Sequence, residues 1–300
     1  MMKPVLYLLF LSVLWGSSFL WTKELLDYFE PTTIVFLRCL FGIAVLLPFL
    51  FLSKNRIDLM KVTPKFLLVV ALAGAIPWNF MGFALQGIDS GLSGILNATT
   101  PLLAVVFSVF LLKVKPLRNQ VLSLIIGFIA VVSLLIFSGQ AVGGQFSLFH
   151  ALLMFGTTSC YALNSIYVNK YYSHIPALQL CFWTLAIAVI TNGPISLLIE
   201  PAAVLQLGSP AVFLPLLVLG SLSSGLGYVI FYVIISISGP LLAVMVTFIV
   251  PFVSITLGVL FLDEPLHIGI AVGLPLMIVS LLLMNLHSIK FRKVRGSTVE

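Results

Sequence analysis

The sequence predicts an all-α polytopic membrane protein in which ten transmembrane helices form two inverted five-helix repeats. Three observations lead to this fold class: an apolar composition, ten apolar runs of spanning length, and a pattern that recurs half a chain later. Apolar residues make up 61% of the 300 residues and charged residues only 8%, against about 25% charged in an ordinary soluble domain. The mean hydropathy is +1.21. This composition excludes a soluble globular protein, a disordered chain and a nucleic-acid-binding protein.

Apolar runs that are long enough to cross a bilayer follow one another along almost the entire chain. A spanning helix needs about 20 consecutive, mostly apolar residues. The first run is too long for the apolar core of a signal peptide, and no small-residue cleavage site follows it, so we expect it to be retained. We predict spans at 4–22, 32–52, 66–86, 90–112, 118–138, 147–168, 176–199, 210–236, 239–262 and 266–287.

The distribution of Lys and Arg predicts the orientation of these spans. Cytoplasmic loops of membrane proteins carry an excess of both residues. With the N-terminus inside, every Lys and Arg that lies outside a span, except Lys23, falls in a cytoplasmic segment, and most of the acids fall on the other side. We therefore expect a multi-pass protein of the plasma membrane with both termini in the cytoplasm.

The fourth and fifth spans resemble the ninth and tenth. The segment 101–117 runs from a proline inside an apolar helix to a charged turn closed by Pro-Leu, and the segment 251–266 does the same. Because each half has five spans, an odd number, the second half enters the membrane from the opposite side, as in many transporters. We assign 1–140 to the first repeat, 141–290 to the second, inverted repeat and 291–300 to a cytoplasmic tail. Chance similarity between two Leu- and Val-rich stretches is the alternative explanation.

Several short motifs occur along the chain in a fixed order. They are Trp15-Gly16-Ser17-Ser18-Phe19 followed by Lys23, then Pro31 and Arg38, the prolines Pro101 and Pro251, and finally Leu262-Asp263-Glu264-Pro265-Leu266. Together they resemble the drug/metabolite transporter superfamily and its EamA-like ten-helix branch, in which the last motif is similar to a Leu-Gly-Glu-x-Leu turn. The first half departs from this pattern with Lys113-Val114-Lys115-Pro116, where the family often has an acidic turn. The resemblance covers nearly the whole chain and implies a transporter of small metabolites or drugs, often an exporter.

The centres of the predicted spans contain no Asp or Glu. Because a charge inside the membrane is costly, this pattern argues against a carboxylate proton relay and against a site for a strongly cationic drug. Arg38 is the one charge predicted within a span, about 10 Å along its helix from Pro31. Two roles are open for it. Arg38 either binds a substrate carboxylate or anchors a gating network, or it pairs with helix-end carbonyls or with Glu24 and fixes helix packing.

Several spans carry polar and aromatic residues on one face at helical spacing. Such faces avoid lipid, and they either pack against other helices or line a water-filled cavity. Aromatic rings and uncharged amides suit an amphipathic ligand that is neutral or zwitterionic. For the larger residues we expect a binding cavity, with packing as the alternative, and the family resemblance also supports Trp15. The predicted substrate-binding residues are Trp15, Trp78, Asn79, Asn97, Tyr161, Asn164, Tyr228 and Thr247.

Two prolines at equivalent places are candidate hinges. Pro101 and Pro251 each free a backbone carbonyl one turn earlier, near Asn97 and Thr247. These carbonyls can coordinate substrate or water, although the kinks can equally serve only to shape the bundle. Lys23 lies at the predicted outer surface, where a solvated or gating role is favoured over binding. The predicted gating or structural residues are Lys23, Arg38, Pro101 and Pro251.

The inverted repeat and the uncharged aromatic and amide faces favour a carrier that moves small amphipathic metabolites by alternating access. Amino acids, their derivatives and drugs are the expected substrates, and export is the expected direction. The spans contain no motif for a nucleophile, a metal site or an acid pair, so we expect no enzyme activity, no metal and no cofactor. We expect a small-molecule substrate and membrane lipid as partners, no nucleic acid, and a pathway that a monomer can supply. A flippase for lipids or lipid-linked precursors is the alternative, and it would show a lateral opening between helices.

Overall fold

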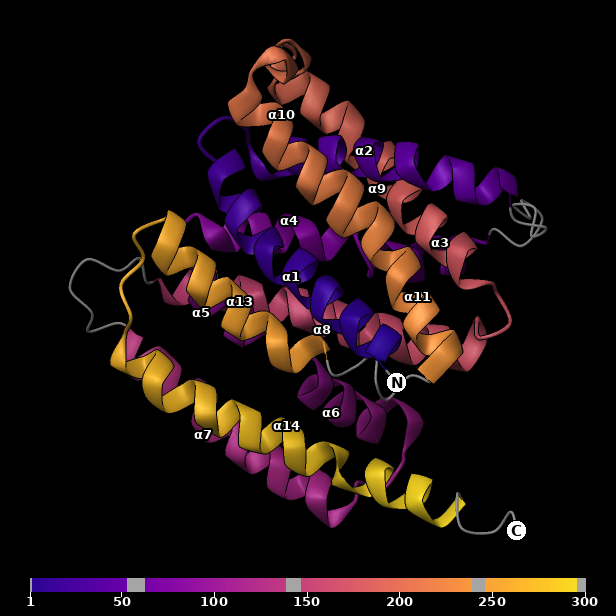
Figure 1. Ribbon diagram of the computed structural model, residues 1–300, viewed down its shortest axis with the longest axis vertical. Helices are drawn as coiled ribbons and strands as arrows, with labels where there is room; N and C mark the ends of the chain where they lie inside the picture. The colour runs from indigo at the N-terminus through magenta and orange to yellow at the C-terminus, as the bar shows by residue number, and fades with distance from the viewer. Residues whose placement is uncertain (1, 53–62, 139–146, 239–245, 296–300) are drawn as a thin grey trace.

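The computed structural model describes residues 2–52, 63–138, 147–238 and 246–295, and the regular elements within these ranges are all helices (Figure 1). The predicted boundary between the halves at 140/141, the start of the ninth span and the end of the tail lie outside the described residues. Single helices form five of the first seven predicted spans. They are α1 (Met2–Leu25), α2 (Pro31–Leu52), α7 (Arg118–Ser138), α8 (Leu148–Tyr171) and α9 (Ala177–Ile199).

Three predicted spans are each divided into shorter helices. The third consists of α3 (Pro64–Ala71) and α4 (Ala75–Leu85), and the fourth of α5 (Ser90–Asn97) and α6 (Thr100–Leu112). The eighth follows a 3-10 helix, η2 (Ala203–Gly208), and consists of α10 (Pro210–Leu216), the π-helix η3 (Leu217–Leu226) and α11 (Gly227–Ser238). The last two spans are α13 (Val246–Phe261) and α14 (Ile268–Arg295).

Seven of the described segments are long and apolar enough to cross a membrane by themselves. Helix α13 and the apolar part of α14 are shorter. Helix α8 carries more polar residues, and it packs against α4, α5 and α6. Large apolar side chains cover the outer surface, with Phe51 and Leu198 each 84% exposed. Such a surface is stable only against lipid tails. The structure thus has the ten-helix, all-α membrane fold that the sequence predicts.

The fourth span is interrupted and not merely kinked, because one helix ends before Pro101 and another begins. Pro101 lies in the first turn of α6, where a missing N–H breaks no helical bond. The hydroxyls of Thr99 and Thr100 donate to the carbonyls of Leu96 and Asn97 at 2.7 and 2.8 Å, so these carbonyls keep partners in the membrane. Pro251, by contrast, stays inside the continuous helix α13.

The two halves are related in backbone geometry and in packing. Lys113 and Asp263, which occupy equivalent turns after α6 and α13, are the two non-glycine residues of the described chain with positive φ, at 54° and 52°. Equivalent spans of the two halves pack on each other: α2 contacts α9, α5 of the fourth span contacts α13 of the ninth, and α7 contacts α14. Likewise α1 packs on α13, and α8 packs on α5 and α6. Reciprocal contacts of this kind between the two halves are expected of an internal repeat.

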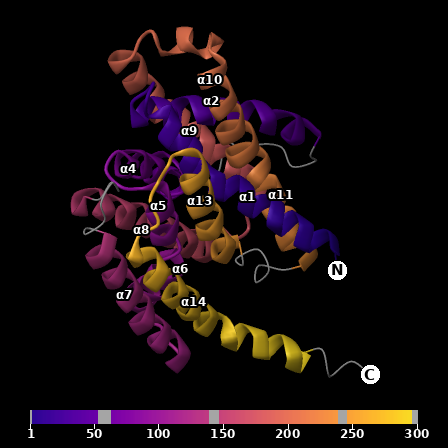
Figure 2. The same cartoon turned by 60° about the vertical axis from the view of Figure 1, so that its left-hand side comes forward.

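Helices α7 and α14 lie side by side along one flank, and both views place them there (Figures 1 and 2). Ser123 and Ser280 fasten this pair, because each hydroxyl donates to the carbonyl of the other residue at 2.7 Å. The remaining helices form the main bundle, in which α1 packs against α13, η3 and α11. Helix α1 begins and α14 ends toward the same side of the molecule, as an even number of crossings requires (Figure 1).

Candidate functional site

Arg38 lies in the interior of α2 and is buried, with 4% of its surface exposed. Its guanidinium carbon stands 4.2 Å from the centroid of the Trp78 ring on α4, in a cation–π contact. Its Nε and Nη2 both donate to Ser224 Oγ, at 3.1 and 2.8 Å. The guanidinium also acts electrostatically on the hydroxyl groups of Tyr161 and Tyr228. Three of the predicted substrate-binding residues, Trp78, Tyr161 and Tyr228, therefore meet around one buried cation.

The position of Ser224 depends on the π-helix η3. The Ser224 hydroxyl donates to the carbonyl of Leu219, five residues earlier, at 2.9 Å. A glycine allows η3 to approach α2 closely, because a Cβ on Gly220 would lie 2.6 Å from the Arg38 carbonyl oxygen. π-helical turns interrupt regular hydrogen bonding and are frequent at functional sites. Here the turn aims a hydroxyl at the guanidinium of the other half.

Trp15 belongs to a second aromatic group, which joins α1 to α11. Its ring centroid lies 5.8 Å from that of Tyr228 in an edge-to-face arrangement and 5.3 Å from that of Phe231. Its indole N–H donates to the Ser223 carbonyl at 3.2 Å. Because Tyr228 also lies near Arg38, the two aromatic groups adjoin each other.

Two of the predicted asparagines connect neighbouring helices. Asn79 Nδ2 donates to the Ala75 carbonyl at 2.7 Å and to Asn192 Oδ1 at 2.6 Å, which links α4 to α9. Asn164 Nδ2 donates to the Val69 carbonyl at 2.7 Å and links α8 to α3. These bonds agree with the alternative role considered for the polar faces, which is packing between helices. Substrate contact by either amide stays a prediction.

Asn97 and Thr247 lie at helix ends beside the two prolines. Asn97 is the last residue of α5, and its Oδ1 is buried without a hydrogen-bond partner. Thr247 is half-buried in the first turn of α13. In the part of the chain described, no hydrogen bond joins Asn79, Asn97 or Asn164 to the group around Arg38.

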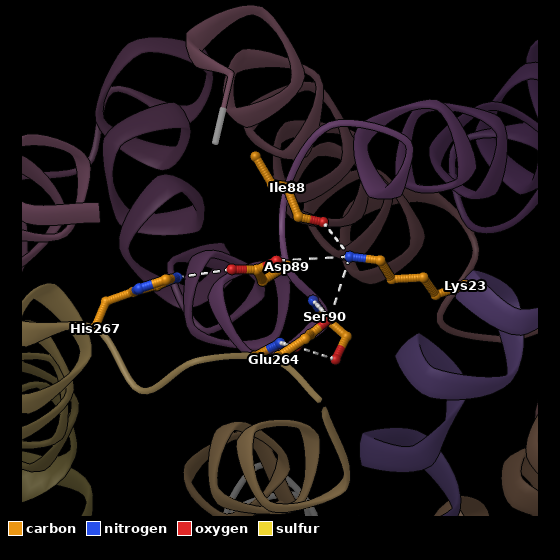
Figure 3. A network of polar contacts seen from close by, with 7 residues as sticks. Lys23, Ile88, Asp89, Ser90, Glu264 and His267 are labelled. Atoms are coloured by element: carbon orange, nitrogen blue, oxygen red, sulfur yellow. Dashed lines mark hydrogen bonds and ion pairs between the residues drawn. The ribbon is translucent and has the colours of Figure 1, made fainter. Parts of the chain in front are cut away.

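Four ionisable side chains meet at the end of the bundle where α1 ends (Figure 3). Lys23 Nζ lies 3.2 Å from Glu264 Oε1 and 3.7 Å from Asp89 Oδ1, and it donates to the Ile88 carbonyl at 3.1 Å. His267 Nε2 lies 2.7 Å from Asp89 Oδ2. Asp89, Glu264 and His267 are all buried. We call the group of Lys23, Asp89, Glu264 and His267 the latch.

Glu264 also caps α5, a helix of the other half. The backbone N–H groups of Ser90 and Gly91 donate to its carboxylate at 2.7 and 3.1 Å, and the Ser90 hydroxyl donates at 2.8 Å. Unpaired N–H groups and the helix dipole stabilise a negative charge at this position. Gly258 leaves the space, because a Cβ there would collide with the carboxylate. The latch thus joins α1 and α5 to the turn between α13 and α14.

Several residues of both groups are absent from the predicted set. Ser224 is a small hydroxyl residue in the eighth predicted span, and nothing in a sequence pattern reveals the π-helix that carries it. Glu264 stands in the Leu262-Asp263-Glu264-Pro265-Leu266 turn, which was the available signal, but its partner helix lies in the other half. Within the described residues, no group of three or more His, Cys, Asp or Glu side chains is placed to hold a metal ion.

The sequence profile of the EamA-like transporter family matches residues 2–136 and again 148–286. The chain belongs to the EamA-like transporter family. This membership makes it an integral membrane transporter rather than an enzyme, and it accounts for the internal repeat.

Full-length relatives support the same membership. The uncharacterized transporter YvbV of Bacillus subtilis is 26% identical over 95% of this chain and 92% of its own length. The uncharacterized transporter YoaV of the same organism is 24% identical over 98% of this chain and 100% of its own. A solved crystal structure superposes with a TM-score of 0.67 at 20% identity, covering 96% of this chain and 98% of that one, which supports the fold alone.

Proposed function

We propose that this EamA-like protein exports small amphipathic metabolites across the plasma membrane by alternating access between its two repeats, 1–140 and 141–290. The observation that carries the proposal is the latch. Among the described residues, the ion pairs between the first half and the second lie at this one end of the bundle. Val114 occupies the place in the first half that Glu264 occupies in the second, so the equivalent turn has no acid there. An end that is held by a few ionic bonds can be released and remade.

The latch end is the outer end in the orientation predicted from Lys and Arg, with both termini in the cytoplasm. The described conformation is then closed toward the outside. Release of substrate requires the turn between α13 and α14 to move away from Lys23 and from the N-terminus of α5. The aromatic residues around Arg38 lie deeper in the bundle than this closed end. An alternating-access carrier holds its substrate in such an interior position.

Transport by purified protein in liposomes tests this proposal. The panel contains aromatic and aliphatic amino acids, their metabolites and amphipathic drugs, each with and without an imposed pH gradient. We expect uptake of at least one class, and loss of that uptake in Trp78→Ala, Asn97→Ala and Tyr228→Ala. The matched control is Phe128→Ala, because Phe128 is a lipid-facing aromatic residue that is 70% exposed. Normal transport by all three folded variants would refute the site assignment.

A lipid or lipid-linked precursor flippase is a second candidate, and one observation favours it. Helices α13 and α14 and the turn between them line an open, largely apolar lateral pocket of about 380 Å³. Its wall includes the exposed Phe252 and Leu266 at the lipid surface and the buried His267 of the latch. A lipid-scrambling assay with the same liposomes separates the two functions, because a metabolite carrier leaves the lipid distribution unchanged.

A further inference from the structure

Arg38 carries a buried positive charge, and its described partners are all neutral. Of the five N–H donors of its guanidinium, those on Nε and Nη2 reach one hydroxyl, that of Ser224. The Ser224 proton is directed to the Leu219 carbonyl, so the hydroxyl presents only lone pairs to Arg38. Among the described residues, no ion pair involves Arg38. A buried charge without a counter-charge is costly, and an anion that arrives at this place removes that cost.

The buried carboxylates of the described chain are engaged elsewhere. Asp89 contacts Lys23 and His267, and Glu264 contacts Lys23 and the N-terminus of α5. Both acids lie in the latch and not beside Arg38. A ligand ammonium group near Arg38 would therefore meet a like charge and no buried acid. This arrangement disfavours amines and also zwitterions.

Aromatic side chains surround the guanidinium and are held in place. Trp78 is 5% exposed, and its ring lies over the Arg38 guanidinium. Tyr161 of α8 lies close enough to interact electrostatically with the same guanidinium. Tyr228 approaches from α11 and has the Trp15 ring against its edge. A planar guanidinium fork matches a carboxylate in two parallel hydrogen bonds. Flat rings nearby match an aromatic body on the same ligand.

We propose that Arg38 binds the carboxylate of an aromatic monoanion, and that this site discriminates against amines and zwitterions. The inference rests on the proposed transport function and narrows its substrate class. Trp78, Tyr161, Tyr228 and Trp15 contact the aromatic part of the ligand.

Four compounds with one phenylethyl skeleton test the charge preference: 3-phenylpropanoate, 3-phenylpropanamide, phenylalanine and 2-phenylethylamine. Equilibrium binding to the full chain in lipid nanodiscs is measured by titration calorimetry, and flux is measured separately in liposomes. Wild-type protein is compared with Arg38→Gln, which removes the charge, and with Arg38→Lys, which keeps the charge but not the fork. Arg118→Gln is the matched control, because Arg118 is exposed at the start of α7.

We expect wild-type protein to bind the propanoate about 10- to 100-fold more tightly than the amide, as for a hydrogen bond to a charged group. Phenylalanine and the amine should bind more weakly than the propanoate. Arg38→Gln should lose the preference, Arg38→Lys should keep part of it, and Arg118→Gln should keep all of it.

Equal binding of the amide, tighter binding of phenylalanine, an unchanged preference in Arg38→Gln, or no binding of the propanoate would each overturn the inference. The comparison of the four ligands on wild-type protein needs no variant. The proposal can therefore be refuted even if an Arg38 variant fails to fold. Binding of the propanoate without flux of any compound would refute the transport function instead. Flux of other compounds without a carboxylate preference would refute only the ligand class.

Discussion

Replacement of Glu264 by Gln tests the latch with a change of one charge and almost no change of shape. The carboxylate is 8% exposed, pairs with Lys23 and accepts two backbone N–H groups and one hydroxyl at the start of α5. The amide keeps one acceptor oxygen, but it brings an NH₂ group toward donors and cancels the charge. We therefore expect the closed end to open more often.

The size of the effect follows from the surroundings of Glu264. Removing one partner of a buried ion pair costs about 3–5 kcal/mol. The lower end applies here, because the Lys23 side chain is 16% exposed and keeps the Ile88 carbonyl and Asp89 as partners. About 3 kcal/mol corresponds to an opening equilibrium that rises about 100-fold.

Hydrogen exchange at the amides of Ser90 and Gly91 reports this equilibrium directly, since both N–H groups bond to Glu264 in the latched state. We expect exchange about 100-fold faster in Glu264→Gln. The control is Asp263→Asn, which removes a neighbouring exposed charge at a residue with φ of 52°, a conformation that Asn tolerates. Unchanged exchange in Glu264→Gln, or equal acceleration in Asp263→Asn, would refute the reasoning.

Two further predictions concern helix packing, and both are measured by thermal unfolding in nanodiscs together with transport. Ser280→Ala removes one of the two reciprocal bonds between α7 and α14, so we expect a loss of about 0.6 kcal/mol with normal transport; a loss of transport would show that this flank moves in the cycle. Gly94→Ala places a Cβ against the Ser254 side chain of α13, and overpacking of this kind costs about 1–3 kcal/mol. Ser254→Gly should restore stability to Gly94→Ala, and a double variant no more stable than Gly94→Ala would contradict this account.

The sequence predicts much of the group around Arg38, and the reason is chemical. A charge or a bulky polar ring inside an apolar run is expensive in lipid wherever it lies, so Arg38, Trp78 and Tyr161 are conspicuous without coordinates. Their contacts are not predictable in this way. Ser224 reaches Arg38 from a π-helix, and no sequence pattern in its span predicts that helix type.

By itself, the sequence determined the ten spans, the half-length repeat and the membrane environment, because these depend on local composition and on the fixed thickness of a bilayer. The tertiary structure decided where spans break and which side chains meet. Pro101 begins a new helix after a break in its span, whereas Pro251 lies inside the continuous helix α13, although the two segments have similar sequences. Lys23 and Glu264 lie at opposite ends of the chain, and only the folding of the second half onto the first brings the carboxylate to the N-terminus of α5. Pairings of this kind depend on packing across the whole chain, which hydropathy and spacing do not record.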